Sequence, residues 1–375
     1  MRSIRILPSL AAGLALAVTA AACGSSNNNS TSTSGSKSAA ATAANPAKGG
    51  SISGAGATFP QPVYDEWANR FKKETGTTVN YNGIGSGGGI AQFTAGTVDF
   101  GATDSAMDDT EVKAAQKKGE PVHIPTVFGA VTVSYNVQGV DKGLKLDGPT
   151  VADIFLGKIK TWDDAKIKAQ NPGTQLPGTA IEVVHRSDES GTTKLFTTFL
   201  ADYSPEWKSG PGVDKSVKWP TGTGAKGNSG VAAGVQQTDG AIGYVELAYA
   251  LQNNFTTAAV KNQGGQYVEP TLESTSAAGD GLKVPADLRF SAINSPNPKA
   301  YPIASATFLL VYQDACKAGL DPTKAALVQN WVNYATTAGQ DVAPELQYAP
   351  LPEAIRTQAQ AKVDGLQCNG APLKK

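Results

Sequence analysis

Three segments of this 375-residue chain share one pattern, in which a β-rich run ends in a glycine- and hydroxyl-rich turn that opens a helix. The three turns contain Thr58, Ser86 and Ser190. Strands that alternate with helices through short loops are typical of a parallel sheet flanked by helices. In such a sheet, each loop that follows a strand and opens a helix lies at the edge where ligands bind. The pattern therefore predicts an α/β fold and the edge at which its site should lie.

The clearest of the three turns lies between a strand at residues 182–184 and an apolar helical stripe at residues 195–200. Ser190 stands at the predicted N-cap, with Gly191 and Thr192 in the first turn. The first turn of a helix has free N–H groups and the positive end of the helix dipole, so it favours anions. This turn is a candidate anion site.

Arg186 lies just before this turn and carries a planar fork of donors suited to a tetrahedral oxyanion. In an extended segment, Arg186 and Asp188 lie on the same face, so we expect Asp188 to orient the guanidinium group. A simpler interpretation stays open for this stretch alone, namely an ordinary capped helix beside a solvent-facing Arg–Asp pair.

The rest of the chain supports two α/β lobes. The first lobe is expected to comprise residues 50–130 and 301–375, and the second lobe residues 131–300. Two long β-rich runs, at residues 127–135 and 303–312, are expected to be the crossovers, and a helical C-terminus follows the second run. The shorter strands are expected near residues 51–56, 77–82, 97–102, 181–184 and 241–245, and the helices after Pro60 and near residues 90–93, 151–156, 192–200 and 230–236.

If the two lobes face each other, their helix starts surround one cleft. Donors outnumber acceptors there, so the expected ligand is an oxyanion. Asp104, at the end of the third strand, is the one acid in the set. A carboxylate beside an anion repels it unless the anion has a proton to share, and phosphate at neutral pH has one whereas sulfate does not. Asp104 would then select phosphate; alternatively it is a turn residue or the cap of a helix after it.

These residues lie in motifs that resemble the phosphate-binding protein family of the bacterial phosphate-specific ABC transporter. The similarity spans about residues 50 to 355, and its motifs occupy residues 54–60, 81–88, 98–104, 186–192, 218–220 and 240–246. The resemblance implies a two-lobed periplasmic-binding-protein fold that closes on inorganic phosphate and delivers it to membrane permease subunits. By the same resemblance, we expect no catalytic activity, no cofactor and no metal. We also expect the protein to be a monomer.

By position in these motifs, the resemblance implies a set of phosphate ligands and one supporting acid, Asp188, which orients the arginine. The implied ligands are Thr58, Phe59 (backbone N–H), Ser86, Asp104, Arg186, Ser190, Gly191 (backbone N–H) and Thr192. Two positions depart from the pattern. Gly87 stands where other members can carry a second serine, and Glu189, where a glycine can stand, adds negative charge beside the site.

The N-terminus resembles an export signal. Residues 1–22 contain Arg2 and Arg5 followed by an apolar run too short to span a membrane, and they predict a lipoprotein signal peptide with Cys23 as the lipidated residue. A plain secretory signal that happens to contain Cys23 is the alternative. Residues 23–49 have almost no large apolar side chains and are expected to be a flexible tether. The folded part is therefore expected outside the cell membrane and anchored to it by lipid.

Cys316 and Cys368 are the two remaining cysteines. In an exported chain they suggest one disulfide that ties the C-terminal tail to the body. Two separate buried thiols are the alternative.

Other function classes have weaker support. Lys plus Arg and Asp plus Glu both number 32, so no basic excess suggests nucleic acid. Two GxGxxG matches lack the setting of a dinucleotide site in an exported protein. With only two histidines and no nucleophile–base pair or metal set, a phosphoester hydrolase is disfavoured. A receptor for another oxyanion, such as sulfate or molybdate, stays open, although Asp104 argues against it.

Overall fold

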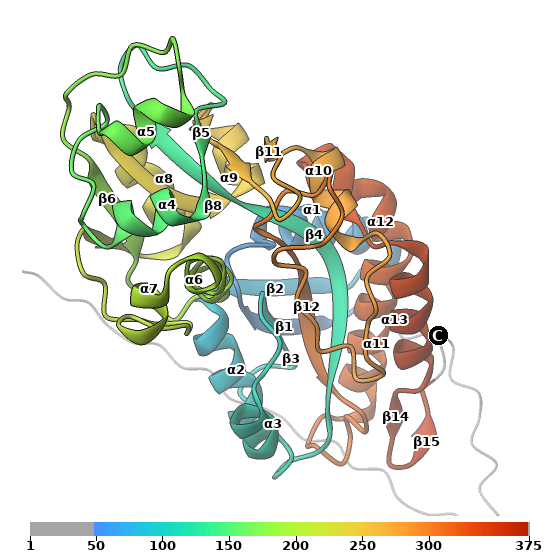
Figure 1. The fold of residues 1–375 in the computed structure, drawn as a ribbon. Helices are drawn as coiled ribbons and strands as arrows, with labels where there is room; N and C mark the ends of the chain where they lie inside the picture. Colours follow the sequence, from blue (N-terminus) through green and yellow to red (C-terminus); the bar gives the residue numbers. More distant parts are fainter. Residues whose placement is uncertain (1–48, 374–375) are drawn as a thin grey trace, which may run out of the picture. The chain divides into compact units, whose positions relative to one another are not determined.

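The computed structural model describes residues 49–373 of the chain. The predicted signal peptide, Cys23 and almost all of the predicted tether lie outside the described residues. The main sheet has the strand order β2-β1-β3-β12-β4-β8-β6-β7, with β9 and β13 also paired to β4 (Figure 1). Its strands are β1 (Ser51–Gly56), β2 (Thr78–Gly83), β3 (Phe100–Thr103), β4 (Pro121–Asn136), β6 (Glu182–Arg186), β7 (Thr223–Ala225), β8 (Ala241–Glu246), β9 (Thr256–Thr257), β12 (Ala304–Tyr312) and β13 (Ala349–Pro350).

Helices alternate with these strands along the chain, and two small sheets complete the fold. The helices are α1 (Gln61–Thr75), α2 (Ser86–Ala95), α3 (Asp109–Ala115), α4 (Gly148–Phe155), α5 (Ala165–Gln170), α6 (Gly191–Tyr203), α7 (Pro205–Ser209), α8 (Gly227–Gln237), α9 (Leu247–Gln252), α10 (Leu272–Gly279), α11 (Pro322–Thr336), α12 (Ala338–Val342), the 3-10 helix η1 (Ala343–Leu346) and α13 (Glu353–Asp364). The small sheets contain β5 (Lys145–Leu146), β10 (Ala259–Lys261) and β11 (Tyr267–Val268), and β14 (Gln367–Cys368) and β15 (Ala371–Pro372).

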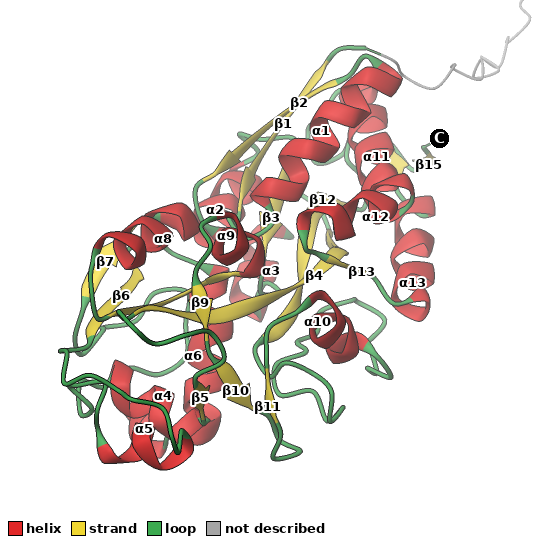
Figure 2. Cartoon of the chain, turned by 90° about the horizontal axis from the view of Figure 1, so that it is seen from above, coloured by secondary structure: helices red, strands yellow, loops and turns green. Residues whose placement is uncertain are grey.

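The first predicted alternation of strands and helices is confirmed. β1 pairs in parallel with both β2 and β3. Helix α1 follows Pro60 as predicted and buries Val63, Trp67 and Phe71; it is capped by Gly76, whose φ of 75° favours glycine. Figure 2 shows α1 running alongside β1 and β2.

Side chains of β3 pack on both faces of the sheet, because successive residues of a strand point to opposite sides. Phe100 joins a core that contains Trp67 of α1 and Trp331 of α11. On the opposite face, a Cβ on Gly101 would lie 2.9 Å from the Cβ of Phe93 in α2, so α2 packs tightly there. The arrangement is the helix-flanked sheet that the sequence predicts.

The two long β-rich runs of the sequence are β4 and β12, which pair with each other in antiparallel orientation between residues 121–130 and 304–312. β4 then continues and pairs with β8 through residues 131–136. The returning chain runs beside it, because Val131 donates a backbone hydrogen bond to the Ile303 carbonyl at 2.7 Å. Both crossing segments therefore lie next to each other. The lobe boundaries at residues 130 and 300 stay a prediction.

The second alternation is also confirmed. β6 pairs in parallel with β8 on one side and with β7 on the other. The predicted helices at 192–200 and 230–236 are α6 and α8, each starting a little earlier than expected. The strand β7 was not predicted.

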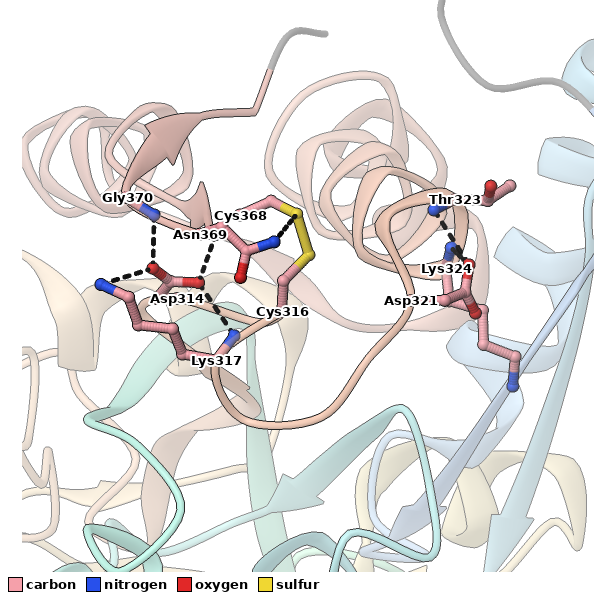
Figure 3. The surroundings of a disulfide bond; sticks show 9 residues. All are labelled: Asp314, Cys316, Lys317, Asp321, Thr323, Lys324, Cys368, Asn369 and Gly370. Atoms are coloured by element: carbon pink, nitrogen blue, oxygen red, sulfur yellow. Dashed lines mark hydrogen bonds and ion pairs between the residues drawn. A yellow bond between two sulfur atoms is a disulfide. The ribbon is translucent and has the colours of Figure 1, made fainter.

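The C-terminal segment is tied to the body by the disulfide between Cys316 and Cys368, which confirms the predicted pairing (Figure 3). Beside it, the Asp314 carboxylate accepts backbone hydrogen bonds from Asn369 at 2.9 Å and Gly370 at 2.7 Å. The same carboxylate lies 3.3 Å from the Lys317 ammonium group. The tail is thus held by a covalent bond and by one carboxylate. Among residues 49–373, no helix is both long and apolar enough to cross a membrane.

Candidate anion-binding site

The predicted site residues lie where three strands end and three helices begin. Thr58 and Phe59 lie between β1 and α1, and Ser86 is the first residue of α2. Asp104 directly follows β3, Arg186 ends β6, and Ser190, Gly191 and Thr192 open α6. All eight are buried. Hydrogen bonds join five of them directly, namely Ser86, Asp104, Arg186, Gly191 and Thr192.

The Arg186 guanidinium is buried, with only 1% of its side chain exposed. Its Nε donates to Asp188 Oδ1 at 2.7 Å, and Nη2 donates to the other carboxylate oxygen. This bidentate pair fixes the plane of the guanidinium, as the sequence predicted. Nη1 remains directed toward the hydroxyl of Thr192, at 3.5 Å. The simpler interpretation of a solvent-facing pair is wrong.

Asp188 also accepts a hydrogen bond from the backbone N–H of Gly227, which begins α8, at 3.0 Å. Burial raises the pKa of this carboxyl, but the hydrogen bonds and charge of Arg186 outweigh burial, so its pKa lies below the ordinary value. Asp188 therefore stays ionised and holds Arg186 against the start of α8.

The Ser86 hydroxyl joins two of the site's segments. Its Oγ accepts hydrogen bonds from the backbone N–H groups of Gly191, at 3.0 Å, and Asp104, at 3.2 Å. A hydroxyl oxygen has two acceptor lone pairs and one hydrogen to donate. Because both lone pairs are engaged, the Ser86 hydroxyl is left to act as a donor.

Asp104 is the acceptor at the centre of the site. Its Oδ1 accepts from the Thr307 hydroxyl at 3.0 Å, and its Oδ2 accepts from the Thr192 hydroxyl at 3.3 Å. Burial raises the pKa of Asp104 from 3.8 to about 7, even though Thr307, Arg186 and Thr192 oppose the shift. Asp104 is thus a carboxyl that changes its charge near neutral pH. The next helix along the chain is α3, and its N-cap is Asp108. Asp104 is therefore not a helix cap.

The three helix starts differ in how they are capped, and the predicted N-cap at Ser190 is confirmed. Only Ser190 caps its helix through its side chain, by accepting from the Thr193 N–H at 3.1 Å. Helix α1 has Pro60 at its N-cap and α2 has Gly85, and neither has a side-chain cap. The Thr58 and Ser86 hydroxyls are therefore not used by their own helices. Phe59 is fully buried, and its carbonyl accepts from the Tyr348 hydroxyl at 2.6 Å.

Two polar residues of the site were not predicted. Asn228, the second residue of α8, donates from its side chain to Thr58 Oγ1 at 2.9 Å and to Thr192 Oγ1 at 3.4 Å. Thr307 of β12 holds Asp104. Asn228 lies in a further strand–turn–helix segment, in which the short strand β7 leads into helix α8. Thr307 lies within a continuous β-rich run and gives no sequence signal.

Each of the two histidines is engaged by neighbouring residues away from the candidate site. His123 is buried and accepts from the Met107 N–H at 3.0 Å, and burial lowers its pKa to about 4. His185 stacks on Trp219 with ring centroids 4.7 Å apart, on the far side of its strand from Arg186. Within residues 49–373, no group of three or more His, Cys, Asp or Glu residues could hold a metal ion.

Comparison with known proteins places this chain among binding proteins. The PBP superfamily domain matches residues 38–338. The phosphate-binding protein PstS of Pasteurella multocida is 43% identical over 328 residues, which cover 86% of this chain and 93% of that protein. PstS of Haemophilus influenzae is 44% identical over 314 residues, covering 82% and 91%. These relatives are named as binding proteins, in agreement with the prediction that the chain is not an enzyme.

Among solved structures, a high-affinity periplasmic phosphate-binding protein, PfluDING, bound with phosphate at pH 8.5, is similar with a TM-score of 0.68. It is 25% identical, and the match covers 83% of this chain and 93% of that one. The fold is therefore the two-lobed fold of the periplasmic binding proteins, as predicted. By sequence and by fold, the chain belongs to the PstS family of phosphate-binding proteins.

Proposed function

We propose that this protein binds inorganic phosphate at the buried cluster around Asp104. The proposed ligands are the predicted set, Thr58, Phe59 (backbone N–H), Ser86, Asp104, Arg186, Ser190, Gly191 (backbone N–H) and Thr192. The observation that carries the proposal is the balance of hydrogen-bonding groups. A buried guanidinium and a hydroxyl that can only donate surround one carboxyl with a pKa near 7. Such a set fits an anion that accepts many hydrogen bonds and gives one.

Phosphate matches this balance better than sulfate does. Monohydrogen phosphate carries one proton at neutral pH, which it can donate to the Asp104 carboxylate. Sulfate carries none, so the ionised Asp104 carboxylate, the form present above its pKa of about 7, would face a second negative charge in a site that excludes water. Asp104 would therefore select phosphate through the cost of an unpaired repulsion.

Closure around the anion is the second part of the proposal. Several contacts join residues from the predicted first lobe to residues from the second. Ser86 contacts Gly191, Asp104 contacts Thr192, and the Gly87 N–H donates to the Glu189 carbonyl at 3.0 Å. We infer that these contacts form when the lobes close and separate when the anion is released, the usual hinge transition of such proteins.

The proposal extends to transport. The protein would act as a monomer outside the cell membrane, anchored by lipid at Cys23 through the tether of residues 23–49, and would deliver phosphate to the permease subunits of an ABC importer. The sequence of the N-terminus and membership of the PstS family support this. Labelling of the protein with palmitate, or inhibition of its signal-peptide processing by globomycin, tests the lipid anchor. Palmitate label on a Cys23→Ala variant would contradict the anchor at Cys23.

The role of Arg186 offers a direct test of the site. In calorimetric titration with phosphate, Arg186→Ala should show no measurable binding, because it removes the buried cation and leaves Asp188 uncompensated. Arg186→Lys keeps the charge but loses the bidentate geometry, so it should bind about 10- to 100-fold more weakly than wild type.

The matched control is Arg356→Ala, which removes an arginine paired with Glu353 on helix α13. It should bind phosphate as wild type does. Wild-type affinity in Arg186→Ala would show that the assigned site is wrong.

A further inference from the structure

The Thr58 hydroxyl has both of its acceptor positions filled by one residue. Thr58 Oγ1 accepts from the Asn228 backbone N–H at 3.1 Å and from the Asn228 side-chain amide at 2.9 Å. A hydroxyl oxygen has two lone pairs, so neither of these contacts uses the hydroxyl hydrogen. The Thr58 hydroxyl is therefore left to donate, which is the role an anion requires of it.

The orientation of the Asn228 amide is set by the chain itself. The Glu246 backbone N–H, which can only donate, lies 3.0 Å from Asn228 Oδ1. The amide nitrogen must then face Thr58 and Thr192, at 2.9 and 3.4 Å. Asn228 is fully buried, so water does not compete for these bonds. With an accepting group in its place, the Thr58 hydroxyl would be drawn away from the anion.

The same part of the chain also holds the backbone of Thr58. The Tyr249 hydroxyl of helix α9 donates to the Thr58 carbonyl at 2.6 Å. Glu246 is the N-cap of helix α9, and its side chain accepts from the Ala248 N–H at 2.8 Å. Glu246 thus orients Asn228 through its backbone and caps the helix that carries Tyr249. The hydroxyl and the carbonyl of Thr58 are thus held by Asn228 and Tyr249, and both of these residues are held in turn by Glu246 or the helix that it caps.

We propose that Asn228 is a positioning residue for phosphate binding, which forces the Thr58 hydroxyl to donate and joins helix α8 to the site. The inference rests on the proposed function, because it needs an anion at the cluster. Asn228 does not touch the anion in this account. Its effect passes through Thr58, and to a smaller extent through the longer bond to Thr192.

A double-mutant cycle on phosphate affinity tests this coupling, with Thr58→Val, Asn228→Ala and the combined variant measured by calorimetric titration. Thr58→Val should bind about 10- to 100-fold more weakly, since it removes a hydrogen bond to a charged ligand. Asn228→Ala should bind about 10-fold more weakly. The combined variant should be within about threefold of Thr58→Val, because without the hydroxyl the amide has nothing to orient.

Independent losses that multiply in the combined variant would overturn the inference, as would wild-type affinity in Asn228→Ala. Melting temperatures establish that each variant is folded, and Asn228→Ser replaces Asn228→Ala if the alanine variant is not. Ser229→Ala is the matched control, because Ser229 is the next residue of α8 and is exposed, and it should leave the affinity unchanged. Wild-type protein that fails to bind phosphate would instead contradict the proposed function.

Discussion

At the scale of single residues, Asp104 combines near-complete burial with a position among donors. Its side chain accepts from two threonine hydroxyls, and the Arg186 charge acts on it as well, yet burial still raises its pKa to about 7. Without an anion, the folded protein therefore holds a proton on Asp104 between pH 4 and 7 that the unfolded chain releases. By linkage, this bound proton stabilises the folded protein. Its contribution to the free energy of unfolding is full below about pH 4 and is lost as the pH rises through 7.

The Asp104→Asn variant should remove this pH dependence. In phosphate-free buffer, the melting temperature of wild type should fall by several degrees between pH 5 and 8 relative to that of Asp104→Asn, because a pKa shift of this size amounts to several kcal/mol. Thermal unfolding of both proteins across that range measures it. Parallel curves for the two proteins would show that Asp104 does not titrate in this window. The variant should also lose its selectivity for phosphate over sulfate, since the neutral amide does not repel a second negative charge.

Gly87 and Glu189, the two positions that depart from the family pattern, contact each other in the structure. A Cβ on Gly87 would lie 2.5 Å from the Cβ of Glu189, too close for a real pair of atoms, and closer still to its carboxylate. The glycine therefore makes room for the glutamate. The sequence showed both departures, but only the fold shows that the two residues lie against each other.

Exchanging the two residues tests this coupling. Gly87→Ser alone should weaken phosphate affinity by about 5- to 100-fold, because the clash opposes closure and overpacking costs about 1–3 kcal/mol. In a Glu189→Gly background, the same change should cost less than about threefold. Calorimetric titration of the four proteins gives the answer, and an equal loss in both backgrounds would refute the coupling.

At the scale of elements, the strand–turn–helix pattern predicted α1, α2, α6 and their strands, because each turn carries glycine and hydroxyl groups beside an apolar stripe. The same rule applies to β7 and α8, but β7 has only three residues and its segment, residues 223–225, reads as a glycine-rich turn. Asn228 was missed for this reason. Thr307 was missed because its contact with Asp104 depends on β12 lying next to β3, a pairing between residues about 200 positions apart.

Helix α3 provides a further contact between the two halves of the site. Glu111 completes a capping box with Asp108 and also pairs with Lys215, whose side chain is only 6% exposed. The Lys215 carbonyl accepts from the Ser190 N–H at 2.9 Å, directly before α6. The ion pair thus connects α3 to the start of the helix that carries Gly191 and Thr192.

Breaking this pair should destabilise the closed form. Lys215→Met should release phosphate about 5- to 50-fold faster in stopped-flow dilution, because it leaves Glu111 partly buried without its partner. Lys215→Arg keeps the charge and is the matched control, with a rate close to that of wild type. If Lys215→Met releases phosphate at the wild-type rate, the pair does not contribute to closure.

At the scale of the whole molecule, the sequence predicted two α/β lobes, long crossing strands and the disulfide. Periodicity and hydroxyl placement are local properties that indicated the strands and helices, and the disulfide followed from the two remaining cysteines of an exported chain. The position of β12 between β3 and β4, and the C-terminal helices that pack Trp331 against Trp67, depend on long-range packing that no local pattern encodes. The predicted site residues each belong to a local motif at the end of a strand or the start of a helix, and for this reason the sequence could indicate them together.

The central claim is that this fold selects phosphate through one proton acceptor among donors. Calorimetric titration of anion-free protein with phosphate, and separately with sulfate, at pH 8, above the pKa of Asp104, tests it most directly. The account predicts tight binding of phosphate and no heat from sulfate by wild type, and a loss of this selectivity in Asp104→Asn, whose neutral amide does not repel sulfate. Binding of sulfate with an affinity similar to that of phosphate would contradict the selective role of Asp104, and no heat from either anion would contradict the proposed function.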